Sequence, residues 1–183
     1  MTGLYIGIAI LVLLLIYIFA TYNGFVKMRN RVKEAFSTMD VCLKKRWDLI
    51  PNIVEVVKGY VKHEQDTFTE LTKLRSGVYD NMTDEEKVAS SNKIAAGLSK
   101  VMALAEAYPD LKASTNFRDL SGQLTQVEEE IAKSRKYYNG CIRLYNNKIQ
   151  MVPSNIVAKL FGFKAEKMFE ISLSERENVS IDL

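Results

Sequence analysis

The chain has 183 residues, a formal net charge of +3 and a hydrophobic content of 48%. The small positive excess does not indicate a nucleic-acid partner, and the length suits one folded domain beside a short N-terminal segment. Cys42 and Cys141 lie too far apart in the sequence to indicate a disulfide framework or a metal site, and they fit a reducing compartment.

The N-terminal segment is apolar and uncharged, which predicts a transmembrane helix. Between Leu4 and Ala20 only two tyrosines carry polar side-chain atoms. About 20 such residues in a helix cross the ~30 Å hydrocarbon core of a bilayer. A cleaved signal peptide is the alternative, but such peptides carry basic residues before the apolar run, and this segment has none. We expect residues 1–22 to form a membrane anchor, whose span includes Leu4, Ile8, Leu11, Leu15 and Ala20.

The residues that follow the apolar segment predict its orientation. Lys27, Arg29, Arg31 and Lys33 come directly after it and are accompanied by one nearby acid, Glu34. Cytoplasmic flanks of membrane spans are rich in lysine and arginine. We therefore expect the N-terminus outside the membrane and the C-terminal domain in the cytoplasm.

Apolar residues at helical spacing predict the first two helices of the domain. The first runs from Tyr22 to about Trp47 and continues the anchor without a break. The sequence Asp48-Leu-Ile-Pro51 predicts a corner, because proline suits the first turn of a new helix and aspartate can cap it. A second helix would then cover residues 52–79, followed by a turn at residues 80–83.

Two further helices complete the predicted domain. Thr83 and Glu86 form a capping box at the start of the third helix, which ends before Pro109. The fourth is the longest, with apolar residues from Phe117 to Tyr145 at alternating steps of three and four. This period indicates the core seam of a bundle, with an intermolecular coiled coil as the alternative. The predicted fold is all-α, a long antiparallel four-helix bundle over residues 23–152 behind one transmembrane helix.

The sequence shows no catalytic, cofactor-binding or metal-binding constellation, so we expect no enzyme, no cofactor and no small-molecule substrate. His63-Glu64 begins like a zinc-protease motif, but Thr67 stands where the second histidine belongs and the chain has one histidine. Ser–His and Cys–His mechanisms would also depend on that single histidine. The pairs Tyr138-Asn139 and Tyr145-Asn146 predict rings in the core and hydrogen bonds at its rim, with a ligand site as the alternative.

A series of motifs along nearly the whole chain resembles the LemA family of bacterial membrane-associated proteins. The matching segments are the apolar span followed by Tyr22-Asn23, then Arg31–Phe36, Asp40–Arg46, Asp48–Asn52, Val57–Tyr60, His63-Glu64, Glu106–Ala113, Asn116-Phe117, Tyr137–Asn139, Tyr145-Asn146, Pro153–Asn155 and Phe161–Phe163. The resemblance implies the mirror variant of an up-and-down four-helix bundle on a single-pass anchor in the bacterial inner membrane, with no established enzymatic activity. One branch of the family is linked to magnetosome membrane compartments, and other members are encoded near membrane proteases.

The up-and-down arrangement predicts that two motifs meet at the end of the bundle away from the membrane. These are the corner at residues 46–52 and the loop at residues 108–116. Capping of the helices explains most of their residues and is the interpretation that we favour. The alternative is a tip that docks a partner and consists of Lys44, Lys45, Arg46, Asp110 and Lys112.

The C-terminal segment, residues 153–183, begins with a basic amphipathic stretch. Its candidate contacts with an anionic membrane surface are Lys159, Leu160, Phe161, Phe163 and Lys164. The alternative is a short helix folded onto the base of the bundle. We favour the second interpretation, because Pro153 and Gly162 provide corners at which the chain can turn back.

These features together predict a membrane-anchored helical scaffold that acts by binding. The expected partners are the lipid bilayer and a protein, which is a second copy of the chain, a membrane protease or another envelope protein. Membrane remodelling is the competing function. An enzyme is the third class and has the least support, because acid, base and metal-binding groups do not cluster in the sequence.

Overall fold

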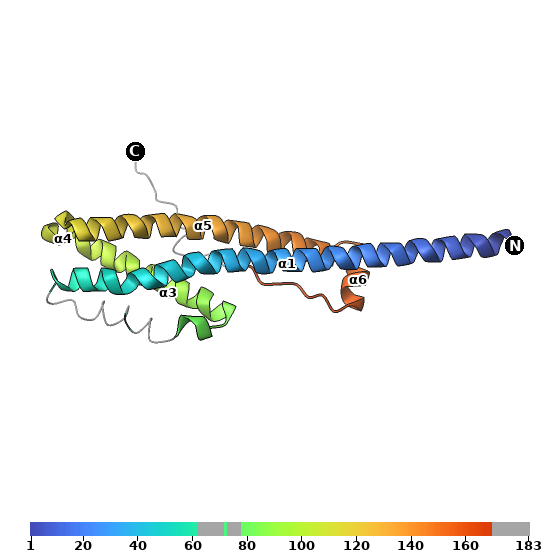
Figure 1. Ribbon diagram of the computed structural model, residues 1–183, viewed down its shortest axis with the longest axis horizontal. Coiled ribbons are helices and arrows are strands. Elements are labelled where there is room, and N and C mark those ends of the chain that lie inside the picture. Colours follow the sequence, from blue (N-terminus) through green and yellow to red (C-terminus); the bar gives the residue numbers. More distant parts are fainter. Residues whose placement is uncertain (62–71, 73–77, 170–183) are drawn as a thin grey trace, which may run out of the picture. The chain divides into compact units, whose positions relative to one another are not determined.

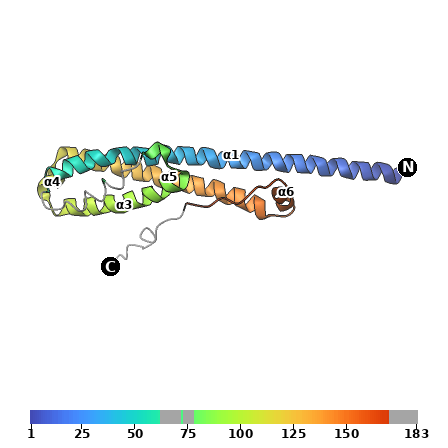
Figure 2. The ribbon, with the colours of Figure 1, turned by 90° about the horizontal axis from the view of Figure 1, so that it is seen from below.

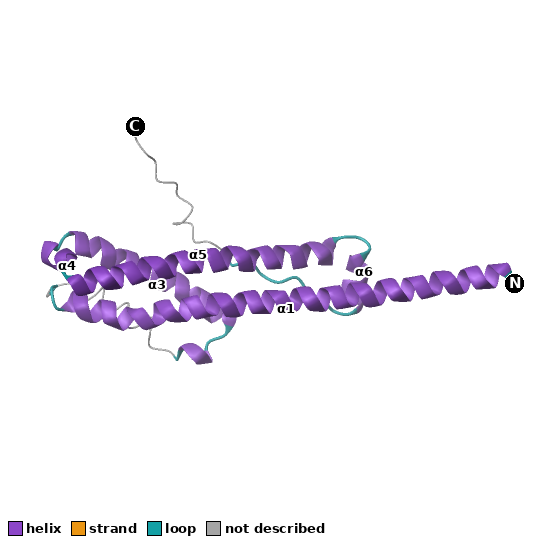
Figure 3. Cartoon of the chain, turned by 45° about the horizontal axis from the view of Figure 1, so that its top comes forward, coloured by secondary structure: helices purple, strands orange, loops and turns teal. Residues whose placement is uncertain are grey.

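The computed structural model describes residues 1–61, 72 and 78–169 of the chain. Helices and loops make up these ranges, with no strand among them, which confirms the predicted all-α fold (Figures 1 and 3). The elements are α1 (Thr2–Lys58), the 3-10 helix η1 (Tyr79–Asn81), α3 (Asp84–Glu106), α4 (Pro109–Ala113), α5 (Thr115–Gln150) and α6 (Ser154–Leu160). Two compact units share these elements: unit 1 comprises residues 1–37 and 135–169, and unit 2 contains residues 38–134.

Helix α1 is one uninterrupted helix of 57 residues. It confirms the predicted continuity with the anchor, but the predicted corner at residues 48–51 is wrong, because Pro51 lies inside the helix. A proline in a helix interior costs about 3 kcal/mol, whereas burying one large apolar side chain contributes roughly 1.5–3 kcal/mol. Four apolar side chains around Pro51 are buried and outweigh its cost: Trp47, Ile50, Ile53 and Val57.

Most of the predicted second helix, together with His63 and Thr67, lies outside the described residues. Its predicted end at Tyr79 falls in η1, a single 3-10 turn. The third helix begins as predicted. The Thr83 hydroxyl accepts a hydrogen bond from the Glu86 N–H, and the Glu86 carboxylate accepts one from the Thr83 N–H.

Unit 2 packs α3 and α5 against the second half of α1 (Figures 1 and 2). Asp40 and Arg46 of α1 contact Lys87 and Ser91 of α3, so these two helices run parallel. Lys45 and Arg46 contact Glu130 and Glu128 of α5, so α5 runs antiparallel to α1. These directions are those of an up-and-down bundle.

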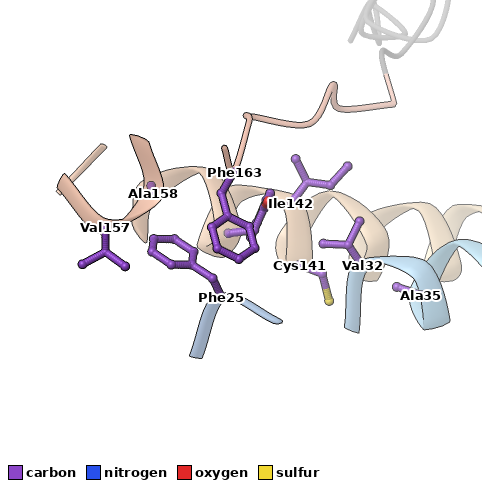
Figure 4. Close-up of a cluster of buried hydrophobic side chains, with 9 residues drawn as sticks. Phe25, Val32, Ala35, Cys141, Ile142, Val157, Ala158 and Phe163 are labelled. Carbon is purple, nitrogen blue, oxygen red and sulfur yellow. The ribbon is translucent and has the colours of Figure 1, made fainter. Parts of the chain in front are cut away.

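Unit 1 packs the first part of α1 against the end of α5 and against α6. Phe36 contacts Tyr138 and Phe25 contacts Tyr145, so α1 and α5 are antiparallel here as well. Both cysteines are free, and Cys141 is buried. The core of this unit, shown in part in Figure 4, consists of Phe25, Val32, Ala35, Cys141, Ile142, Tyr145, Val157, Ala158 and Phe163.

The N-terminal part of α1 is the only stretch of the described residues that is long and apolar enough to cross a membrane. An 18-residue window in it has a mean hydropathy of 2.7, and none of that window is buried. Every large apolar side chain from Leu4 to Ile16 is exposed to an extent that water does not favour. The described residues of the chain provide no covering for these side chains.

Candidate functional site

The C-terminal segment turns back onto unit 1, as the positions of Pro153 and Gly162 predict. Residues 151–153 form a turn with a cis Val152–Pro153 peptide bond, and α6 follows. Gly162 then adopts a φ of 71°, in the left-handed region where a side chain would be strained. After it, residues 163–169 continue without helix along α5, and we call them the strap.

Two asparagines on α5 hold the strap by its backbone. The Asn146 amide donates to the Glu166 carbonyl oxygen at 2.8 Å and accepts from the Glu166 N–H at 2.9 Å. Asn139 makes the same pair of bonds with the backbone of Phe169, at 2.9 and 2.8 Å. Seven residues of helix rise about 10 Å, and three residues of extended chain also span about 10 Å. The spacing of the two Tyr-Asn pairs therefore matches the strap.

This geometry confirms the prediction of rings in the core and hydrogen bonds at its rim. Tyr145 is buried, and burial raises the pKa of its phenol. The amide groups of Asn139 and Asn146 are occupied by the strap rather than by a ligand. The strap itself is missing from the sequence-based prediction, because a backbone that is bound by asparagines needs no particular side-chain pattern.

An aromatic cluster joins α1 to the strap and to the end of α6. The Phe25 ring stacks on Phe163 at 4.9 Å between centroids and meets the edge of Tyr145 at 6.3 Å. The Tyr22 ring lies 4.9 Å from Phe161 and 5.6 Å from Phe163. Phe163 is thus buried inside unit 1, and its predicted contact with a membrane surface is wrong. Phe163 is the first residue of the strap, and its ring lies beside that of Phe25 (Figure 4).

Cationic side chains border this cluster. The Lys148 ammonium lies 5.2 Å from the Phe25 ring centroid, and the Arg29 guanidinium lies 5.6 Å from that of Phe163. Both distances suit cation–π attraction. Lys159 and Lys164, two of the predicted membrane contacts, are exposed, as are Leu160 and Phe161. The amphipathic segment therefore packs on unit 1 with one face, through Val157 and Ala158, and leaves its other face uncovered.

A buried arginine is the centre of a polar network in unit 2. Arg46 is 1% exposed, and its guanidinium donates to both carboxylate oxygens of Glu128, at 2.8 and 2.9 Å. It also donates to the Ser91 carbonyl oxygen at 2.7 Å and to the Ser91 hydroxyl. The prediction of Arg46 in an exposed docking tip is therefore wrong. The Arg46 guanidinium instead joins α1 to α3 and α5 inside unit 2.

The other predicted tip residues do not form one surface. Lys44 pairs with Asp48 one turn further along α1, at 3.1 Å. Lys45 pairs with Glu130 at 3.0 Å, and this ion pair raises the pKa of the lysine and lowers that of the carboxyl group. Beyond Lys45, α1 continues to Lys58, which is a rise of about 20 Å. Asp110 and Lys112 belong to α4, where Lys112 pairs with Glu106.

A second polar group, which the sequence did not reveal, surrounds Asp40. Its carboxylate accepts hydrogen bonds from the Tyr79 hydroxyl at 2.7 Å and from the Lys87 ammonium at 2.8 Å. Burial, together with the bond to Asp40, raises the pKa of Tyr79, so the phenol stays protonated and donates. The Tyr79 ring also packs against Trp47, with 5.4 Å between centroids.

The described part of the chain contains no group of three histidine, cysteine, aspartate or glutamate side chains that could hold a metal ion. The two polar groups of unit 2 join α1, α3, α5 and η1 through ion pairs and hydrogen bonds. These interactions hold the helices of unit 2 against one another.

Sequence comparisons identify relatives over most of the chain. Residues 35–183 match the profile of the LemA family. Protein LemA of Metamycoplasma hominis is 26% identical over 158 residues, which cover 86% of this chain and 72% of that protein. Magnetosome protein MamQ 2 of Paramagnetospirillum magneticum is 22% identical over 175 residues, and MamQ of Magnetospirillum gryphiswaldense is 21% identical over 174. Each of these two matches covers 81% of this chain and 64% of the magnetosome protein. With the profile matching from within α1 to the last residue, the chain belongs to the LemA family.

Proposed function

We propose that this protein is a membrane-anchored helical scaffold, which binds other proteins at the bacterial inner membrane and has no catalytic activity of its own. One observation carries the proposal. Helix α1 begins as an apolar span of which nothing is buried and continues without a break into the packed helices. A lipid bilayer would cover the span, and the same helix would hold the packed helices at the membrane.

The charges after the span support an orientation with the packed helices in the cytoplasm. Lys27, Arg29, Arg31 and Lys33 are all exposed on α1. A membrane-impermeant thiol reagent tests this in intact cells with two single-cysteine variants of the full chain, each made in a background that carries Cys42→Ser and Cys141→Ser. Thr2→Cys should be labelled directly, and Lys159→Cys only after the cells are opened. The reverse pattern would contradict the proposed orientation.

Among the predicted tip residues, Asp110 and Lys112 on α4 are the ones we propose as a protein-binding surface. Both are exposed on a short helix that begins with proline in its first turn. The proposed partner is a second copy of the chain, a membrane protease or another envelope protein.

Photo-crosslinking in cells tests the binding function. A crosslinkable residue replaces Asp110 in the full chain, and the matched control replaces Lys133, whose side chain is 77% exposed on α5. A scaffold gives discrete crosslinked species from position 110 and none from position 133. Their masses separate a second copy of the chain from another protein. No discrete species from position 110, or the same species from both positions, would count against this surface.

Membrane organisation is the second candidate function. The uncovered apolar face of α6 supports it, and so do the names of two relatives, which are magnetosome proteins. The two functions differ in a test with purified components. A membrane-organising protein changes the shape of lipid vesicles into which the full chain alone is reconstituted, whereas a scaffold that needs its partner leaves them unchanged.

A further inference from the structure

Five large apolar side chains are exposed in the turn before α6, on α6 and at its end, and we call them the apolar patch. Its members are Met151, 61% exposed, Val152, 76%, Ile156, 66%, Leu160, 70%, and Phe161, 47%. Ile156 and Leu160 stand one helical turn apart and, with Asn155 and Lys159, line a shallow hollow. Five large apolar side chains this close together are unusual on a surface that faces water.

The contacts of α6 within unit 1 fix its level along α1. Tyr22, which touches Phe161, comes two residues after the apolar span ends at Ala20, a rise of about 3 Å. Ile18, inside the span, packs against the cluster that contains Val157 and Ala158 of α6. Thr21 between them is buried. Helix α6 therefore lies beside the last turn of the apolar span.

The charges around the patch match a lipid surface. Residues 151–169 contain three lysines, Lys159, Lys164 and Lys167, against one acid, Glu166. All three lysines are exposed. A short apolar face bordered by lysines is the composition of helices that lie in the interface of a bilayer, where the lysines reach anionic headgroups.

We propose that the apolar patch of α6 is immersed in the lipid interface of the leaflet from which α1 emerges, so that the protein has a second, peripheral contact with the membrane. This inference rests on the proposed anchoring by α1. The strap supports it mechanically, because Asn139 and Asn146 hold residues 166 and 169 on α5 and thereby keep α6 against Tyr22. In this arrangement Phe163 packs in the interior of unit 1, and Ile156 and Leu160 contact the lipid.

Quenching of tryptophan fluorescence by brominated lipids tests the proposal on the full chain. The chain has a single tryptophan, Trp47, so Trp47→Phe provides a background in which one new tryptophan reports alone. Leu160→Trp probes the patch. Ile8→Trp probes the span, and Tyr137→Trp is the matched control, because Tyr137 is 54% exposed in the same unit and lies near Arg31 and Glu34. Each variant is reconstituted into phosphatidylcholine–phosphatidylglycerol vesicles that contain lipids brominated in the upper acyl chain.

The proposal predicts quenching of the Leu160→Trp variant that is comparable to that of Ile8→Trp and several-fold above that of Tyr137→Trp. Strong quenching at position 8 with background quenching at position 160 would overturn the inference and leave the anchor intact. A blue-shifted but unquenched signal at position 160 would also overturn it, because a second copy of the chain then covers the patch. Absence of quenching at position 8 would overturn the anchor and the inference together. Circular dichroism of each variant confirms that its helix content is unchanged.

Discussion

The two compact units use different interactions to hold their helices together. Unit 1 relies on stacked rings and on asparagine side chains that bind the backbone of the strap. Unit 2 adds to its apolar core a buried guanidinium and a carboxylate shared by a tyrosine and a lysine. Charge-assisted hydrogen bonds are roughly twice as strong as those between neutral groups, such as the amide bonds that hold the strap. Both units have apolar cores, and they differ in the polar groups that set the register of their parts: neutral amides in unit 1 and paired charges in unit 2.

The largest effect should come from the aromatic cluster of unit 1. Phe25 is fully buried between Phe163 and Tyr145, so Phe25→Ala removes a ring and leaves a cavity. We expect a loss of about 3–5 kcal/mol in the free energy of unfolding. Chemical denaturation of the full chain in detergent, followed by circular dichroism, measures it. The exposed aromatic control Tyr137→Ala should change stability far less, and equal losses in the two variants would contradict the assignment of the core.

Breaking the arginine network should have the next largest effect. Arg46→Met removes the charge but keeps an apolar side chain of similar length, and it leaves Glu128 and the Ser91 carbonyl without their partner. We expect a loss of about 1–3 kcal/mol, because the Ser91 carbonyl oxygen is left buried without its donor, measured by the same denaturation experiment. A control that removes an exposed ion pair on α5, Lys133→Met, should stay within about 0.5 kcal/mol of the wild type. If Arg46→Met matched that control, the guanidinium would not be a structural centre.

Releasing the strap should have a smaller and local effect. Asn139→Ala and Asn146→Ala each remove two hydrogen bonds to the strap, a loss of about 1–2 kcal/mol. Limited trypsin digestion detects it as faster cleavage after Lys164 and Lys167. The neighbouring Asn147 is exposed, and Asn147→Ala serves as the matched control. Cleavage at equal rates in all three variants would show that the asparagines do not hold the strap.

Removal of the Tyr79 hydroxyl should cause the smallest loss of stability, and this loss should depend on pH. Tyr79→Phe removes one hydrogen bond to Asp40, and we expect a loss of about 1 kcal/mol at neutral pH. The pKa of Tyr79 is raised in the folded state, so the unfolded chain ionises first when the pH rises above about 10. The wild type should lose this contribution there, and the stability difference between the two proteins should shrink. A difference that grows with rising pH would contradict the assigned bond.

The sequence-based prediction succeeded where a pattern is local and failed where the partner is distant. The capping box of Thr83 and Glu86, the seam of α5 and the turns at Pro153 and Gly162 follow from short spacings, and all are present. Pro51 suggested a corner because the local rule ignores the burial of Trp47 and Ile53 around it.

The same limit applies to the candidate sites. The sequence predicted Arg46 in an exposed tip, but the residue is buried, and its partners are 45 and 82 residues away in the chain. Charge patterns along one helix cannot show such a pairing. Of the residues predicted to contact a membrane surface, Phe163 is buried and Leu160 is exposed. The packing of Val157 and Ala158 on one face of α6 and the stacking of Phe163 on Phe25 account for this difference.

Alkaline carbonate extraction of cell membranes tests the anchoring by α1 most directly. The full chain is compared with a variant that carries Leu11→Arg and Leu15→Arg, because each charge at the centre of a span costs roughly 2.5–3.5 kcal/mol. We predict that the wild type stays in the membrane pellet with its N-terminal residues intact and that the double variant is released. A wild-type chain that begins near residue 21 and appears in the carbonate supernatant would contradict the account.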